Sequence, residues 1–338
     1  MALDFKFRRM EMDKMKITSY IIRNFLKMVI LITLTCIITF ILAVNSPIDP
    51  IRQYVGVQTI TEEQREAIKE YWGLNDAKIE RFIKWSSNLL RGDFGKSIMF
   101  RKDVLDIITE RAGNSLSLMI PTFVMTGVFG YFIGLYMGKH PNSIGEQILK
   151  SICIVFTATP NFWVGILMLI IFCLKLGVFP IGFSIPIGAN AADVSILDRI
   201  YHAILPAITL TLVHIPNIAL HTRSKVIEVL ESDYVLFARA RGDSEKSIMK
   251  NHVIKNTVLP AITIHFSSFS EIFGGSILAE NVFSYPGLGS TIVDAGLGGD
   301  IPLLLGITII ASIFVFIGNF ISDLLHLIIN PIIRQEGI

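Results

Sequence analysis

Six long apolar stretches constrain the fold of this chain more than any other feature. Five contain no Asp, Glu, Lys or Arg, namely residues 28–48, 112–138, 151–174, 200–222 and 301–322. The sixth, residues 256–279, contains a single acid, Glu271. Because about 20 apolar helical residues cross a bilayer, we expect six transmembrane helices. A soluble helical protein is a poor alternative, since buried helices are rarely this long without charge.

The composition favours one membrane bundle over a pair of soluble domains. Hydrophobic residues make up 52% of the 338 residues and charged residues only 17%, whereas soluble domains carry about 25% charged residues. The first apolar stretch is longer than a usual signal-peptide core and follows a long charged segment, so we interpret it as a retained anchor. The net charge of +2 gives no indication of nucleic-acid binding. Cys36, Cys153 and Cys173 all lie in apolar stretches, which is typical of small buried residues.

The distribution of charge predicts the orientation and the organisation of the chain. Residues 1–27 carry seven Lys and Arg against three Asp and Glu, and basic flanks stay in the cytoplasm. Residues 280–300 carry three acids and no base, which suits the opposite side. We therefore expect a cytoplasmic segment (1–27), a first anchor (28–48), an extracytoplasmic helical segment (49–111), a five-helix core (112–330) and a cytoplasmic tail (331–338).

Cap signals divide the extracytoplasmic segment into two helices. The sequence TEEQ at Thr61–Gln64 matches a capping box, and Gly73 is placed to end the helix that follows. Asn75 or Asp76 is expected to cap the second helix. An apolar stripe on that helix is expected to pack on the mouth of the bundle; it consists of Ile79, Phe82, Ile83 and Leu90.

Two glycine-containing motifs are interpreted as turns. RGDFGKS at residues 91–97 is not a phosphate-binding loop, because the first glycine of such a loop would fall at position 90, which is Leu90. YPGLG at residues 285–289 has Pro and Gly in the order that suits a type II turn outside the membrane. No other motif for ATP hydrolysis or covalent catalysis stands out, so we expect no catalytic residue and no enzyme activity in this chain.

A strongly charged segment, residues 223–255, separates two of the predicted spans, with 12 charged residues in 33. Residues 223–241 are expected to continue a helix from the fourth span, Gly242 to allow a sharp reversal, and Asp243 or Ser244 to cap a short new helix. An apolar face made by Ile248, Met249 and Val253 suggests a projecting knob that docks in a groove of a partner. An ordinary solvated loop of mixed charge is the alternative.

The same segment carries a resemblance to a known family. ARARG at 238–242 is followed downstream by Leu259 and Pro260, and sixteen residues separate Gly242 from Leu259. This resembles the EAA-loop signature of ABC importer membrane subunits, with the longer spacing of the dipeptide/oligopeptide/nickel permease family. Three further segments are similar to that family: GLNDAKIERFIKWSSNLLRGDFGKSI (73–98), GGSILAENVFSYPGLGSTIVDA (274–295) and NPIIR (330–334).

The resemblance implies an all-α ABC type I importer permease fold in a bacterial cytoplasmic membrane. The chain would form half of a heterodimeric pore with a second homologous permease subunit. Two cytoplasmic ATPase subunits would carry ATP and Mg, an extracytoplasmic binding protein would deliver substrate, and this chain would bind no cofactor. The residues carried over for ATPase coupling are Ala238, Ala240, Gly242, Asp243, Ser244, Glu245, Ile248, Met249, His252, Leu259 and Pro260. The first position of the EAA motif falls on Leu236 instead of Glu, so the acidic contact of that motif is not carried over.

The substrate remains open at this stage. Di- and oligopeptides are the first expectation, and nickel or a metal chelate is the alternative within the same architecture. A self-sufficient ion-coupled carrier using Glu271 is an alternative of another class; such carriers commonly contain internal repeats, and no convincing repeat is visible here. A lone carrier would also leave the segment at 238–260 unexplained.

Three residues in the spans are candidates for the translocation path: Glu271, His265 and His214. Burying an ionisable residue in a membrane is costly unless it faces water or a partner. Glu271 is therefore expected to line a wet pore, to pair with the partner subunit or to bind a metal, in that order of preference. His265 lies six positions before it, about 600° around a helix, so the two make poor partners. His214 and His221 share a face, and Pro216 is expected to kink the helix between them.

Four residues give the outer mouth an acidic and polar character: Glu280, Asn281, Asp294 and Asp300. They are expected to attract a cationic substrate, to be solvated or to contact the binding protein, and the last is preferred. No metal site is predicted in the chain.

Overall fold

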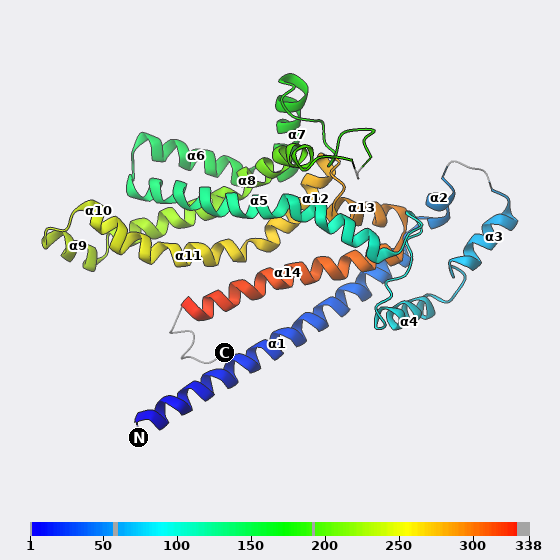
Figure 1. The fold of residues 1–338 in the computed structure, drawn as a ribbon, viewed down its shortest axis with the longest axis horizontal. Helices are drawn as coiled ribbons and strands as arrows, with labels where there is room; N and C mark the ends of the chain where they lie inside the picture. Colours follow the sequence, from blue (N-terminus) through cyan, green and yellow to red (C-terminus); the bar gives the residue numbers. More distant parts are fainter. Residues whose placement is uncertain (1, 57–59, 191–192, 330–338) are drawn as a thin grey trace. The chain divides into compact units, whose positions relative to one another are not determined.

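The computed structural model describes residues 2–56, 60–190 and 193–329, and its regular elements in these ranges are helices (Figure 1). The only extended pairing among them is an isolated bridge between Lys96 and Asp103. This confirms the predicted all-α architecture. The predicted tail, 331–338, and the NPIIR segment, 330–334, lie outside the described residues.

The chain divides into two compact units. The first unit comprises residues 1–109 and 292–338 and contains α1 (Ala2–Val44), α2 (Pro50–Val55), α3 (Glu62–Tyr71), α4 (Lys78–Leu89) and α14 (Ile301–Ile329). The second unit, residues 110–291, contains α6 (Ile144–Ala158), α7 (Asn161–Met168), the π-helical η1 (Leu169–Lys175), α8 (Ile196–Leu230), α9 (Asp233–Ala240), α10 (Glu245–Ile248), the π-helical η2 (Met249–Val253), α11 (Ile254–Ser267) and α12 (Phe269–Val282). Two helices, α5 (Val104–Lys139) and α13 (Leu288–Gly298), continue from one unit into the other.

Four described helices are long and apolar enough to cross a membrane: Ile21–Val44, Val104–Lys139, Ile196–Leu230 and Ile301–Leu325. A fifth candidate is a pair, Ile144–Ala158 with Asn161–Lys175, bent by 108°. The sequence predicted straight spans at 151–174 and 256–279. The first of these is the bent pair, and the second is divided between α11 and α12 and is not among the candidates.

Backbone geometry explains the sharper of these breaks. Thr159, which precedes Pro160, is extended, with φ −94° and ψ 128°. The ring of a proline disfavours helical geometry in the residue before it, so α6 ends at Ala158 and α7 starts beyond the proline. By contrast, α8 continues through two prolines, Pro206 and Pro216, and is 35 residues long.

A row of glycines on α5 brings this helix into backbone contact with α8. A Cβ atom on Gly134 would lie 2.5 Å from the backbone oxygen of Ala219, and one on Gly138 would lie 2.9 Å from the backbone oxygen of Arg223. Gly130, four positions earlier, faces Ile218 in the same way. Small residues at this spacing allow close helix packing in membranes. This row was not among the features predicted from the sequence.

We expect Gly134→Ala to destabilise the protein by about 1–3 kcal/mol, the usual cost of overpacking. The added methyl group meets a backbone oxygen, which no side-chain rotation can move away. The measurement is the thermal unfolding midpoint of the purified protein in detergent. Gly113→Ala is the matched control. Gly113 lies on the same helix, α5, and a Cβ atom there would meet no other atom within 4 Å. Equal midpoints for the two variants would show that α5 and α8 do not pack this closely.

In the first unit, the segment between α1 and α5 packs on α1 and α14 through α4. Phe82 joins a cluster that includes Phe40, with ring centroids 4.9 Å apart, and Leu305. Trp85 and Leu89 complete this contact. The predicted stripe is therefore wrong apart from Phe82, because its other members, Ile79, Ile83 and Leu90, are exposed.

Local cap signals were predicted more accurately for α3 than for α4. Thr61 forms the predicted capping box with Gln64, and Gly73 ends the helix with φ +62°. The predicted cap of α4 is wrong. The N-cap residue of α4 is Ala77, whose side chain makes no capping hydrogen bond. Asn75 instead donates to Glu66, and Asp76 pairs with Lys84.

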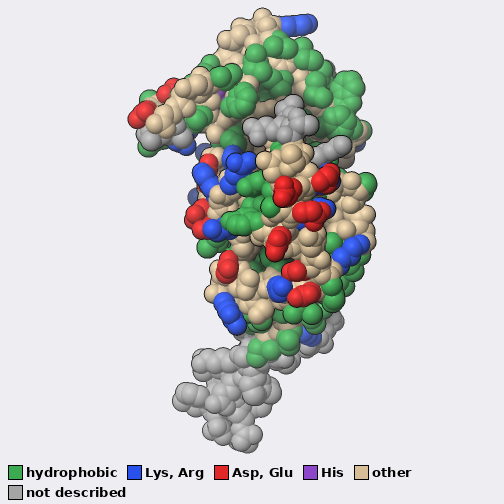
Figure 2. Space-filling model, turned by 90° about the vertical axis from the view of Figure 1, so that its right-hand side faces the viewer, with side chains coloured by type: hydrophobic (Ala, Val, Ile, Leu, Met, Phe, Trp, Pro, Cys, Tyr) green, Lys and Arg blue, Asp and Glu red, His purple; other side chains and the backbone are tan. Residues whose placement is uncertain are grey.

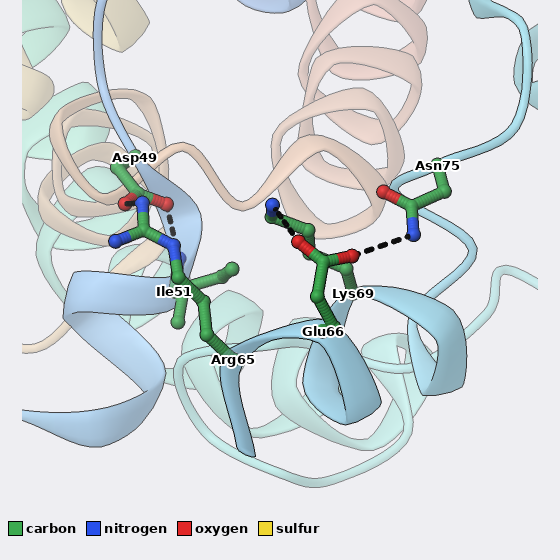
Figure 3. A network of polar contacts seen from close by, with 6 residues as sticks. All are labelled: Asp49, Ile51, Arg65, Glu66, Lys69 and Asn75. Carbon is green, nitrogen blue, oxygen red and sulfur yellow. Dashed lines mark hydrogen bonds and ion pairs between the residues drawn. The ribbon is translucent and has the colours of Figure 1, made fainter. Parts of the chain in front are cut away.

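Polar contacts fix α3 beside the start of α2 (Figure 3). The guanidinium of Arg65 lies 2.5 Å from Asp49, and the other oxygen of Asp49 accepts the backbone N–H of Ile51 at 3.0 Å. Glu66 accepts from Lys69 on the next turn of α3 and from Asn75 in the loop that follows this helix. The segment at 91–97 that follows α4 is a turn, as predicted, with positive φ at Gly92 and Gly95.

Candidate functional site

The charged segment between α8 and α11 forms a helical elbow made of α9, Gly242, α10 and η2. Gly242 has φ +92°, and a Cβ atom there would meet nothing within 4 Å. The glycine is therefore required by the backbone reversal and not by lack of space. Ser244 caps α10 by accepting the N–H of Ser247, as predicted. The predicted continuous helix over 223–241 is interrupted, because α8 ends at Leu230 and α9 begins at Asp233.

Ion pairs hold the two arms of the elbow together. The guanidinium of Arg239 donates to Glu245 at 2.9 Å, and that of Arg241 donates to Asp243 at 2.6 Å. The hydrogen bond from Arg239 lowers the pKa of Glu245. Because the Arg239–Glu245 pair is exposed on both sides, it contributes little to stability, and its main effect is to orient α9 against α10.

The apolar face of the elbow points into the protein, which corrects the predicted projecting knob. Ile248 and Val253 are fully buried, in a cluster with Val226, Val235 and Ala238. Met249 packs against the same cluster. The helical spacing was correct, but the partner of this face is the protein's own α8 and α9. These side chains position the elbow and are not available to dock in a groove.

The outward face of the elbow carries other apolar residues, which the sequence analysis did not select. We name Tyr234, Leu236, Phe237 and Ala240 the α9 surface; all four are exposed. Leu236 is 64% exposed and Phe237 is 68% exposed. Large apolar side chains exposed together mark interaction sites. Leu236, where the generic motif has Glu, therefore belongs to the surface that is open to a partner.

The remaining elbow residues lie close to this surface or on the following helix. His252 is half-buried, with its ring centroid 5.8 Å from that of Tyr234. Leu259 is exposed on α11. Pro260 lies inside α11, which starts six residues earlier at Ile254, so the helix is already formed before the Leu-Pro pair.

A buried ion pair at the base of the elbow was missed by the sequence analysis. The Arg223 guanidinium of α8 lies 2.7 Å from the Glu146 carboxylate of α6, and Glu146 is only 2% exposed. Ser143 caps the same end of α6 by accepting the N–H of Glu146. The available signals were Arg223, the first charge after an apolar stretch, and Glu146, three residues after a capping serine. Neither signal identifies the other residue as its partner.

A polar cavity of about 440 Å³ lies between α6, α7, α8 and α12. Glu271, His214 and His221 line it together with Asn161 and Asn217. His214 is buried, and its Nε2 atom has no hydrogen-bond partner among the described residues. Pro216, predicted to kink α8, also lines this cavity. The structure therefore brings two of the three predicted path residues, Glu271 and His214, to one cavity.

His265 lies in a different place. Its ring stacks on Phe123 with centroids 3.8 Å apart, and its Nε2 atom would lie 2.7 Å from a Cβ atom on Gly127. It lines a separate, mostly apolar cavity of about 330 Å³ beside α5. Glu271 and His265 are therefore not partners. Across the described ranges, no group of three or more His, Cys, Asp and Glu side chains is placed to hold a metal ion.

Two of the four residues predicted at the outer mouth are buried structural groups. Glu280 accepts from the hydroxyl of Ser115 at 2.6 Å and from the N–H of Ser290 at 2.9 Å. Asp300 accepts from the hydroxyl of Ser97 at 2.6 Å. Burial raises the pKa of Asp300, although its hydrogen bonds oppose that shift. The prediction that these two carboxylates meet a binding protein or a cationic substrate is wrong for both, because each is fully buried.

The other two mouth residues, Asn281 and Asp294, are exposed as predicted. The face that carries α2, α3 and α4 shows acidic and basic side chains intermingled over its described residues (Figure 2). The described part of this face is therefore mixed in charge and not dominated by acid.

The YPGLG motif is not a type II turn: residues 285–287 connect α12 to α13, and Leu288 and Gly289 begin α13. That turn requires positive φ at Gly287, but the positive φ of 48° is at Ser284, directly after α12. Tyr285 is buried, and its hydroxyl lies 2.8 Å from that of Ser117. The Pro286 oxygen accepts from Asn114 at 2.8 Å. Side chains of α5 thus hold this segment in place.

A large cavity of the second unit lies next to this motif and was not foreseen. Its volume is about 1090 Å³, and its lining from α5, α8 and residues 183–185 is mostly apolar. Charged groups of both signs also line it: Glu110, Arg111 and Arg199. A cavity of this size accommodates a small organic molecule.

Comparison with known proteins identifies the family. Residues 130–335, which include the elbow and the polar cavity, match the family described as "Binding-protein-dependent transport system inner membrane component". Residues 17–119 match the family of its N-terminal part. The chain belongs to this family. It is therefore a multi-pass membrane protein of the ABC permease type.

Similar proteins cover almost the whole chain. The oligopeptide transport system permease protein AppB of Bacillus subtilis is 32% identical over 314 residues, covering 93% of this chain and 98% of AppB. A probable peptide ABC transporter permease protein of Sinorhizobium fredii is 29% identical over 93% of this chain and 99% of its own length. A putative peptide transport system permease protein of Brucella abortus is 30% identical over 94% of this chain and its full length.

Proposed function

We propose that this chain is the membrane subunit of an ATP-driven importer for di- and oligopeptides. It forms half of the pore and passes the motion of cytoplasmic ATPases to its spans through the elbow. ATP and Mg bind the partner ATPase subunits, a second homologous permease completes the pore, and a binding protein delivers the peptide. The names of the relatives, which are peptide and oligopeptide permeases, support the substrate class.

The elbow is the observation that carries this proposal. Its outward side presents the α9 surface, whereas its inward side is anchored through Ile248 and Val253 to the hydrophobic cluster on α8. Force applied to the α9 surface would thus reach α8 through packed side chains. Arg223 and Glu146 connect the same end of α8 to α6. A helical elbow with an exposed apolar outer face suits docking on a partner protein.

The topology proposed for the chain places this elbow in the cytoplasm. Residues 1–27 carry an excess of basic residues, which favours a cytoplasmic N-terminus. If the bent pair and the α11–α12 pair each cross once, six spans return the C-terminus to the cytoplasm. The elbow then lies on the side where ATPases act.

Two other functions are less well supported. Import of nickel or a metal chelate keeps the same architecture, but the described residues contain no group of three metal-binding side chains. A self-sufficient carrier driven by ions needs no ATPase-docking elbow, so the exposed α9 surface would have no role in it.

The substrate is tested by uptake into cells that carry the complete transporter. We expect labelled trialanine to enter cells expressing all the subunits and to be excluded from cells lacking the binding protein or the ATPases. Nickel uptake, measured at matched expression, is expected to stay at the background level. Selective nickel entry without peptide entry would contradict the peptide assignment and favour the metal alternative.

A further inference from the structure

Two breaks between helices and one proline inside a helix border the polar cavity between α6, α7, α8 and α12. Asn161 is the first residue of α7, directly after the break at Pro160. Pro216 interrupts the hydrogen-bond ladder of α8 on the cavity wall. Glu271 lies in the first turn of α12, just after the break at Ser268. Irregular backbone at membrane depth is tolerated where it is buried in protein or lines a water-filled cavity. The two breaks and the proline therefore meet at one polar cavity.

The walls of this cavity are linked and polar. The Asn217 amide donates to the hydroxyl of Ser268 at 3.0 Å, which connects α8 to the break between α11 and α12. A Cβ atom on Gly275 would lie 2.8 Å from His214 Nε2 and 3.2 Å from Asn161 Nδ2, so these two side chains converge on the same point of α12. This Nε2 atom is buried and has no partner among the residues described.

The chemistry of the wall selects a cationic ligand. Glu271 is the one carboxylate among the described residues that line the cavity, and no Lys or Arg lines it there. The amide oxygens of Asn161 and Asn217 are further acceptors on the same wall. An ammonium group, which carries a positive charge and three donors, fits this set. A peptide carboxylate would be repelled by Glu271.

We propose that this cavity is a subsite for the ammonium group at the N-terminus of a peptide in transit, with the Glu271 carboxylate as its counter-charge. The inference rests on the peptide-import function proposed above and adds a point of recognition inside the membrane unit. His214 and the two amides orient the ammonium group and replace part of its hydration. Recognition of the peptide end in this way is independent of the side chains of the peptide.

The test uses proteoliposomes containing the complete transporter and two probes, labelled trialanine and N-acetyl-trialanine. We expect Glu271→Gln, which keeps the shape and removes the charge, to lower the kcat/KM for trialanine uptake at least about tenfold. Glu271→Asp keeps the charge and is expected to stay within about threefold of the parent. Uptake of the acetylated peptide, which has no ammonium group, is expected to be unchanged by Glu271→Gln. Glu63→Gln is the matched control, because it is an exposed acid in the first turn of α3.

Several outcomes would overturn the subsite. Full trialanine uptake by Glu271→Gln would show that the charge is not used. An equal loss for both peptides, or a loss in Glu271→Asp equal to that in Glu271→Gln, would assign Glu271 a structural role. A selective loss of nickel uptake in Glu271→Gln would identify a metal ligand. If the parent transporter does not take up N-acetyl-trialanine, the test rests on trialanine alone. The kcat/KM for trialanine uptake must then fall in Glu271→Gln and not in Glu271→Asp.

Failure of the subsite is distinguishable from failure of the proposed function. Binding-protein-stimulated ATP hydrolysis is measured in the same proteoliposomes without peptide. If the parent shows this stimulation and takes up trialanine, the importer function stands whatever Glu271→Gln does. If the parent does neither, the importer function itself is contradicted.

Discussion

Replacing Phe237 by Asp is expected to abolish peptide uptake and the stable association of this chain with its ATPase subunits. Phe237 is 68% exposed on α9, whereas its neighbour Ala238 is buried in the cluster that anchors the elbow. Anchor residues at protein interfaces often contribute 2 kcal/mol or more, so binding should weaken by at least about thirtyfold. The measurement is co-purification of the ATPases together with uptake. Leu236→Asp is expected to act in the same way.

The controls separate docking from folding. Leu90→Asp introduces an acid at an apolar residue that is 89% exposed at the end of α4, and it should leave ATPase association intact. Ile248→Asp should instead reduce the amount of folded protein, because Ile248 is fully buried. Normal ATPase association in Phe237→Asp would contradict the assignment of the α9 surface as the docking face. Deleting residues 243–252 is less informative, because it removes part of the hydrophobic cluster as well.

Arg223→Met is expected to destabilise the protein by about 3–5 kcal/mol, because it leaves the buried Glu146 carboxylate without its partner. The pair joins α6 and α8 at the base of the elbow, so the change should also weaken the coupling of ATP hydrolysis to uptake. The measurements are the unfolding free energy in mixed detergent micelles and the ATP consumed per peptide transported.

The double variant Glu146→Leu with Arg223→Met provides the decisive comparison. Replacing both members of a buried ion pair by apolar residues is often neutral or stabilising, so the double variant should regain most of the stability lost by Arg223→Met. Arg65→Met, at an ion pair in which both side chains are partly exposed, should cost no more than about 1 kcal/mol. A similar small loss in Arg223→Met would show that the Arg223–Glu146 pair is not buried as described.

Local signals in the sequence predicted local structure well. The capping box at Thr61, the positive φ at Gly73 and Gly242 and the cap at Ser244 all depend on a few adjacent residues. The four long apolar helices were also evident, because their length and composition are properties of a single segment. The interruption at Pro160 was visible as a proline but was not used in predicting a straight third span.

Features that depend on distant residues could not be predicted in this way. The helical spacing of the apolar residues predicts that Ile248 and Val253 share one face. It does not indicate whether that face packs against another protein or against the chain itself. Glu280 and Asp300 look like surface acids in the sequence, whereas their donors, Ser115 and Ser97, are 165 and 203 residues away. The stacking of His265 on Phe123 depends on the packing of α5 against α11, whereas the separation of His265 from Glu271 followed from their spacing in the sequence.

The most direct test of the central claim is peptide uptake into proteoliposomes with ATP supplied only on the side of the elbow. We predict uptake of trialanine when this chain, its permease partner, the ATPases and the binding protein are present together, and no uptake when ATP or the ATPases are omitted. Uptake by the permease chains alone, driven by a proton or sodium gradient without ATP, would contradict the account and establish an ion-coupled carrier.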